Sequence, residues 1–133
     1  MKINYTKATD DGYIYAYPTD FGGEFGDCAD GVDPFVADYL ISRGLLKKND
    51  VFYTHDVSNG FKSRSHVKGT DEFDDVTGQR VARDKLLSKY YAFQKNALAA
   101  YKKALEKLLD RVDGEKEFAE KKVENANKRL ENY

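Results

Sequence analysis

Apolar side chains at alternating steps of three and four residues mark the C-terminal part of this 133-residue chain. Before Gly114 the series has Gln94 as its one polar member and otherwise contains Leu87, Tyr91, Leu98, Tyr101, Leu105, Leu108 and Val112. After Gly114 the same spacing resumes at Ala119, Val123, Ala126, Leu130 and Tyr133. Such spacing predicts an amphipathic helix with a coiled-coil-like apolar seam.

The pair Asp113-Gly114 interrupts that seam and leaves three arrangements open. A continuous helix would preserve the seven-residue phase that runs from Tyr91 to Tyr133. A helical hairpin turning at Gly114 would pack the two seams against each other, and a homodimer would pair them between two chains. Because Asp-Gly is a poor helix-forming pair, we expect the helical hairpin slightly more than the rod.

Two segments with alternating side chains and central turn residues predict β-hairpins. In the first, residues 3–7 and 13–17 flank Asp10-Asp11-Gly12, with Tyr13, Tyr15 and Tyr17 on one face and Ile14 and Ala16 on the other. In the second, Asn59-Gly60 suits a type I′ turn that would pair Ser58 with Phe61 and Phe52 with Val67. The expected core face of this second hairpin consists of Phe52, Thr54, Ser63, Ser65 and Val67.

Helix signals surround these hairpins. Asp33 and Pro34 suit the cap and first position of a short helix to Arg43, followed by Gly44 as its left-handed terminator. Its expected apolar stripe is Phe35, Val36, Tyr39 and Leu40. Asp74 is the expected cap of the long helix, and Gly78 would let this helix approach the strands closely.

The predicted fold is therefore α+β, with two β-hairpins in a small antiparallel sheet, one short helix, and a long C-terminal helix or helical hairpin. Residues 1–89 would form the core. Residues 90–133 would form a helical extension that packs on the core or makes a coiled coil.

Composition narrows the class of protein. The net charge is only −1, so it indicates no polyanionic partner by itself, and Cys28 is the lone cysteine, which fits a reducing compartment. No apolar run has the length of a membrane span, and the N-terminus lacks signal-peptide character. We expect a cytoplasmic protein.

Motifs for catalysis or cofactors are weak. Cys28 has no nearby base in sequence to pair with, although His55 and His66 occur further along. Two histidines and one cysteine are too few for structural zinc, the acids between Asp20 and Asp33 lack calcium-loop spacing, and no Lys-Ser/Thr follows the glycines at positions 22, 23 and 26. We expect no enzyme activity, no cofactor and no metal.

One module of the chain resembles a known group of proteins. Over residues 50–89 a strand, a polar turn and a second strand lead to Asp71-Glu72-Phe73-Asp74, and Gly78, Ala82 and Lys85 follow at the start of a basic helix. This arrangement is similar to a module of small, mostly uncharacterised phage and prophage proteins, including anti-CRISPR-like accessory proteins. The resemblance implies a phage or mobile-element origin and location in a host cell, but it carries over no catalytic residues.

The N-terminal third is strongly acidic. Between Lys7 and Arg43 there are eight acidic residues and no lysine or arginine. Half of these acids suit turns and caps, and the others share a glycine-rich loop with aromatic residues. The predicted partner-binding residues are Asp20, Phe21, Glu24, Phe25, Asp27 and Asp30. With the resemblance, this face predicts an inhibitor that binds a basic host protein, such as a CRISPR effector, by stoichiometric contact.

An alternative function uses a basic cluster. The candidate nucleic-acid-binding residues are Lys62, Arg64, His66, Lys68, Arg80 and Arg83, with Lys85 and Lys89 following on the same helix. Acidic residues interleave with this cluster, which favours a solvated mixed surface. A structural coiled-coil component, with a homodimer through the C-terminal helices, is the third hypothesis.

Overall fold

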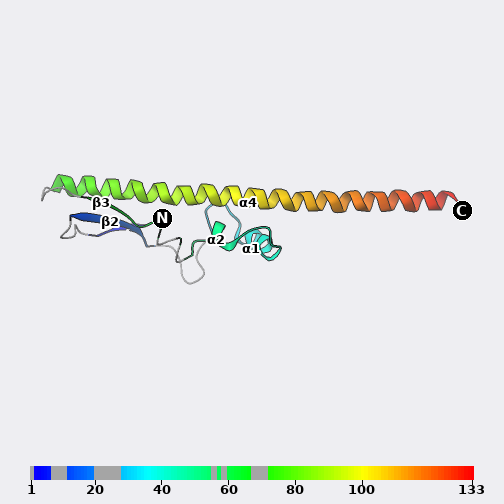
Figure 1. The fold of residues 1–133 in the computed structure, drawn as a ribbon, viewed down its shortest axis with the longest axis horizontal. Helices are drawn as coiled ribbons and strands as arrows, with labels where there is room; N and C mark the ends of the chain where they lie inside the picture. The colour runs from blue at the N-terminus through cyan, green and yellow to red at the C-terminus, as the bar shows by residue number, and fades with distance from the viewer. Residues whose placement is uncertain (1, 7–11, 20–27, 55–56, 58–59, 67–71) are drawn as a thin grey trace.

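A long helix organises the computed structural model, which describes residues 2–6, 12–19, 28–54, 57, 60–66 and 72–133. The elements in chain order are β1 (Ile3–Tyr5), β2 (Tyr13–Pro18), α1 (Pro34–Ser42), α2 (Lys48–Val51), β3 (Ser63–His66) and α4 (Glu72–Glu131). The sheet lies along the first part of α4, and the two short helices α1 and α2 lie along the middle of α4 (Figure 1). The C-terminal part of α4 extends beyond both. The α+β class is confirmed.

The three strands form one antiparallel sheet in the order β1-β2-β3. Ile3 pairs with Pro18 and Tyr5 with Ala16, so the strand pairing of the first predicted hairpin is confirmed, while Asp10 and Asp11 of its turn lie outside the described residues. Ile14 and Ala16 are buried, while the tyrosines that alternate with them are half-buried. This alternation follows from the two-residue period of a strand and gives the sheet an inner face against α4 and an outer face away from it.

The second predicted hairpin is wrong. Residues 48–51 form α2, and Phe52 makes only an isolated bridge with Cys28. β3 pairs with β2 instead, with Ile14 opposite Ser65 and Ala16 opposite Ser63. The predicted inward direction of Ser63 and Ser65 is nevertheless correct, because both are buried. Their small side chains admit α4, and the Ser65 hydroxyl donates a hydrogen bond to the Gly78 carbonyl oxygen.

The helical hairpin expected at Gly114 is also wrong, because α4 continues for 60 residues through that position. One glycine costs a helix about 1 kcal/mol relative to alanine, whereas a reversal would remove several backbone hydrogen bonds. Beyond Gly114, ion pairs join Lys116 to Glu120 and Glu124 to Lys128 on the helix surface. The predicted boundary between residues 89 and 90 falls inside α4, which begins at Glu72, before the expected cap Asp74.

The core-facing side of α4 differs from the predicted seam by one residue. Besides Gly78, the buried positions among the described residues of α4 are Ala82, Leu86, Tyr90, Ala97 and Ala104. Tyr91 and Leu98 of the predicted seam are 57% and 37% exposed, and Tyr101, Leu105 and Leu108 are only partly buried against the core. Alanines on the inner side let α1 and α2 approach the backbone of α4 closely. The predicted seam was chosen there from larger apolar side chains, so it did not include these alanines.

Aromatic rings from the segment between α2 and β3 and from α4 form one cluster. Tyr53 packs against Phe61, Tyr90 and Phe93 at centroid distances of 5.9, 5.9 and 5.0 Å. Phe61 also meets Tyr90 and Phe93 edge-on. Residues that the sequence placed in the second hairpin and on the long helix therefore share one cluster.

Helix α1 begins as predicted, with the Asp33 carboxylate accepting from the amides of Phe35 and Val36 at 2.9 and 3.1 Å. Gly44 has a φ of 73° and terminates it. The predicted stripe is partly wrong: Phe35 is 84% exposed, and Ala37 and Leu40 are the buried residues. A nine-residue helix that contacts its neighbours through a narrow face buries fewer large side chains than a helix with a full apolar stripe would bury.

No helix among the described residues combines the length and apolarity needed to cross a membrane.

Candidate functional site

The outer face of the sheet carries tyrosines at its centre and basic residues at one side. Successive residues of a strand point to opposite faces, so burial of Ile14, Ala16, Ser63 and Ser65 directs their neighbours outward. The register places Tyr13 opposite His66, Tyr15 opposite Arg64 and Tyr17 opposite Asn4. We name these six residues the outer sheet face.

Cations lie directly over two of these rings. The Arg64 guanidinium carbon is 4.4 Å from the centroid of Tyr13, and the Lys62 ammonium nitrogen is 4.8 Å from that of Tyr15. His66 meets Tyr13 edge-on at 5.1 Å. A hydrogen bond with Tyr15 is the main cause that raises the pKa of Arg64. Rings and cations thus alternate across β2 and β3.

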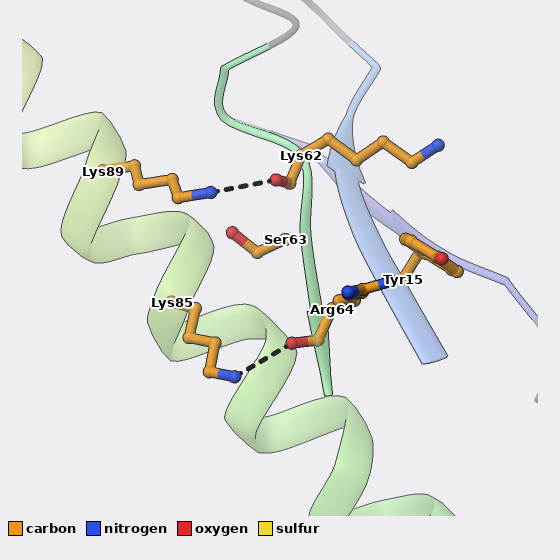
Figure 2. A pocket seen from close by; sticks show the side chains of 6 residues that line it. All are labelled: Tyr15, Lys62, Ser63, Arg64, Lys85 and Lys89. Carbon is orange, nitrogen blue, oxygen red and sulfur yellow. Dashed lines mark hydrogen bonds between the residues drawn. The ribbon is translucent and has the colours of Figure 1, made fainter. Parts of the chain in front are cut away.

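A cleft opens where β3 meets α4. It has a volume of about 510 Å³ and is lined by Tyr15, Lys62, Ser63, Arg64, Lys85 and Lys89. Figure 2 shows Lys85 and Lys89 reaching from α4 to the backbone of β3, while Tyr15 lies on the side of the strands away from the helix. We call this feature the basic cleft.

Backbone hydrogen bonds hold the two helix lysines at the cleft. Lys85 Nζ donates to the carbonyl oxygen of Arg64 at 3.0 Å, and Lys89 Nζ donates to that of Lys62 at 3.2 Å. Their four-residue spacing puts them on one side of α4. Because β3 is an edge strand, these lysines also occupy an edge that would otherwise be open to pairing with another strand.

The chemistry of the basic cleft suits an anion with several oxygens. Among the described residues, four basic residues line it and no acidic residue does. An ammonium group has three N–H donors, so Lys85 and Lys89 each keep donors beyond the one that each gives to the backbone. Arg64 adds a planar donor group that matches phosphate geometry. Phosphate groups are therefore the ligand chemistry that this arrangement fits.

The predicted basic residues separate into groups. Lys62 and Arg64 line the cleft, His66 belongs to the outer sheet face, and Lys68 lies outside the described residues. Arg80 and Arg83 are exposed on α4 but do not line the cleft. Sequence reasoning did not assign Tyr13 and Tyr15 to this site. The sequence showed that both tyrosines lie on one face of a strand. Their proximity to Arg64, however, depends on the pairing of β2 with β3.

The predicted acidic docking face stays a prediction, because Asp20, Phe21, Glu24, Phe25 and Asp27 lie outside the described residues. Its sixth member, Asp30, is attached to α4. The Asp30 carboxylate accepts a hydrogen bond of 2.6 Å from the Tyr90 hydroxyl, and its carbonyl oxygen accepts one of 3.2 Å from Gln94. This contact ties the chain before α1 to the long helix.

The Tyr90 hydroxyl gives the fold a predicted dependence on alkaline pH. Burial first, and then the hydrogen bond to Asp30, raise the pKa of Tyr90 above its ordinary value, and burial raises that of Tyr53. A raised native pKa stabilises the fold at pH values below the unfolded pKa. We therefore expect the free energy of unfolding to fall as pH rises above about 10, where unfolded tyrosine ionises.

The Tyr90→Phe variant tests this expectation in urea titrations between neutral pH and pH 11. Loss of a hydrogen bond to a charged group should lower the free energy of unfolding by about 1–3 kcal/mol at neutral pH and weaken its alkaline decline. Tyr91→Phe, at an exposed neighbouring ring, is the matched control and should leave both unchanged. Identical alkaline curves for the two variants would contradict the assignment to Tyr90.

The C-terminal part of α4 and the residues after it expose several large apolar side chains. They are Leu109, Val112, Phe118, Val123, Leu130 and Tyr133, and the helical period places Phe118 on a different side of α4 from Val112, Val123 and Leu130. The predicted homodimer through this helix stays a prediction, since the structure contains a single chain.

Other candidate chemistry gains no support from the geometry. Burial raises the pKa of the half-buried Cys28 thiol, which lowers the fraction of reactive thiolate. His55 lies outside the described residues, and His66 belongs to the outer sheet face. Within the described part of the chain, no group of three or more histidine, cysteine or acidic residues could hold a metal ion.

Comparison with known proteins identified no relative: no family model, no curated protein and no solved structure matched this chain.

Proposed function

We propose that this chain is an accessory protein that binds nucleic acid by its phosphate backbone in the basic cleft. The observation that carries the proposal is that Lys62, just before β3, and Arg64 of β3 line one cleft with Lys85 and Lys89 of α4. The two helix lysines lie at the edge of β3, and the charged groups of Lys62 and Arg64 lie over the tyrosine rings beside it. Residues more than 20 positions apart in sequence thereby form one positive site. Phosphate contacts by lysine and arginine supply most of the affinity of sequence-independent nucleic-acid binding.

The low net charge of the chain limits the affinity for nucleic acid, but the local charge at the cleft still favours phosphate binding. The whole chain has a net charge of −1, and its N-terminal third is acidic. At physiological salt a charge more than about 8 Å away is largely screened. The groups close to the cleft therefore dominate its field, and four of the described residues that line it are basic. We therefore expect modest affinity at physiological salt and much stronger binding at low salt.

Salt dependence of binding to a labelled oligonucleotide tests the proposal. Four cations paired with phosphates should give a slope of log K against log salt concentration of about −3. The double variant Lys85→Gln/Lys89→Gln should bind about tenfold or more weakly at low salt, and the magnitude of its slope should fall by about 1–2.

Matched variants separate the cleft from the general charge of the protein. Lys95→Gln/Lys102→Gln removes the same charge from exposed positions of α4 outside the cleft and should retain wild-type binding. Arg64→Gln leaves the lysine contacts to the strand backbone in place and should also weaken binding. Equal weakening by both double variants, or no binding by the wild type at low salt, would overturn the proposal.

A further inference from the structure

The basic cleft and the outer sheet face share two residues. Tyr15 and Arg64 belong to both, and Lys62 lines the cleft while its ammonium lies over the Tyr15 ring. Beyond them lie Tyr13 and then His66. A ligand whose phosphates sit in the cleft would therefore extend directly onto tyrosine rings.

We infer that this combined surface binds single-stranded nucleic acid, with phosphates in the basic cleft and unpaired bases stacked on the tyrosines of β2. The inference rests on the proposed function and narrows its ligand class. Grooves with cations along the backbone and aromatic rings beneath the bases are the physical basis of single-strand recognition. An open sheet face with aromatic residues on its central strand can present such rings side by side.

Ring spacing favours unpaired bases. The centroids of Tyr13 and Tyr15 are 6.5 Å apart, close to the two-residue repeat of a strand. Bases within a duplex are about 3.4 Å apart and face one another, so no tyrosine of a flat sheet can enter their stack. A single strand can separate its bases and place successive or alternate ones on neighbouring rings. Duplex DNA would contact the cleft through phosphates alone.

The cations over the rings can be exchanged for bases. An exposed cation–ring contact contributes about 0.5–1 kcal/mol, whereas a base stacked on an aromatic side chain contributes about 1–3 kcal/mol. When Arg64 turns away from the Tyr13 ring, its guanidinium can pair with a phosphate of the ligand, and a base can stack on the exposed ring. Lys62 and Tyr15 allow the same exchange. The balance of these energies favours the bound arrangement.

Three probes of equal length test the inference by fluorescence anisotropy at low salt: a mixed-sequence single strand, its duplex, and an abasic single strand. The wild type should bind the mixed-sequence strand most tightly. Tyr15→Leu keeps apolar bulk without an aromatic ring and should weaken that binding about 5- to 100-fold, the loss of one stacked base. Tyr15→Phe keeps the ring and should stay within about twofold of the wild type.

Duplex and abasic probes should be much less sensitive to Tyr15→Leu than the mixed-sequence strand is, because neither probe can stack an unpaired base on the ring, although Tyr15 also lines the cleft. Tyr17→Leu, on the same face beside Asn4, is a second ring variant, and thermal unfolding identifies any variant that fails to fold. Equal affinity for all three probes, with no effect of either leucine variant, would overturn the single-strand inference and leave phosphate binding in place. Absence of binding to every probe would instead remove the proposed function.

Discussion

Leu86→Ala is expected to lower the free energy of unfolding by about 2–5 kcal/mol, the usual cost of emptying a buried leucine site. Leu86 is 0% exposed on the side of α4 that belongs to the core with Ala16 and Ala82. The three-stranded sheet packs on this helix through its inner face, where Ser63 and Ser65 provide little apolar area. Few other large side chains can compensate for the lost contacts.

Urea denaturation followed by circular dichroism measures this change. Leu109→Ala is the matched control, because Leu109 is 62% exposed on the same helix, and it should change the free energy of unfolding by less than about 0.5 kcal/mol. Similar destabilisation by both variants would show that the C-terminal part of α4 is packed as tightly as the part beside the sheet, contrary to the structure.

Gly31→Ala is expected to destabilise the protein by about 1–3 kcal/mol through strain and crowding together. Gly31 has a φ of 88°, a region that costs a residue with a Cβ about 1–2 kcal/mol. A Cβ at this position would also lie 3.1 Å from Leu98 Cδ2 on α4. The neighbouring Asp30 bonds to Tyr90, so displacement of this turn would disturb the attachment of the N-terminal half to the long helix.

Gly114→Ala makes the same chemical change as Gly31→Ala but is expected to stabilise the protein. Gly114 lies within α4, and apart from the neighbouring helix backbone no atom lies within 4 Å of a Cβ built there. Alanine should therefore raise the free energy of unfolding by about 0.5–1 kcal/mol, because it reduces the backbone freedom of the unfolded chain. Thermal unfolding of both variants should give midpoints on opposite sides of the wild type. Shifts in the same direction would contradict either the turn at Gly31 or the continuous helix.

Stability and the proposed binding site use alternate residues of the same strands. Ile14, Ala16, Ser63 and Ser65 face α4, while Tyr13, Tyr15, Arg64 and His66 belong to the outer sheet face. Substitutions on the outer face can therefore alter ligand binding with little effect on the core. Lys85 and Lys89 are the exception, since their backbone contacts also hold the edge of β3.

Local patterns in the sequence determined several elements. The alternation at residues 13–17 specified a strand and divided its side chains between two faces, but it did not specify which face is buried. Asp33-Pro34 specified the start of α1 through a side-chain cap. The apolar spacing after Leu87 specified helix. Each of these signals acts between residues a few positions apart, where side-chain period and capping hydrogen bonds operate.

Only the tertiary structure decided the partner of β3, the inner side of α4 and the proximity of the four basic residues that line the cleft. A turn signal at Asn59-Gly60 cannot show that the edge of β2 competes successfully for Ser63–His66. Likewise, the value of Ala97 and Ala104 as packing positions appears only when α1 and α2 approach them. Strand pairing and close packing depend on contacts between segments that are distant in the sequence. The spacing of residues within one segment therefore cannot predict these contacts.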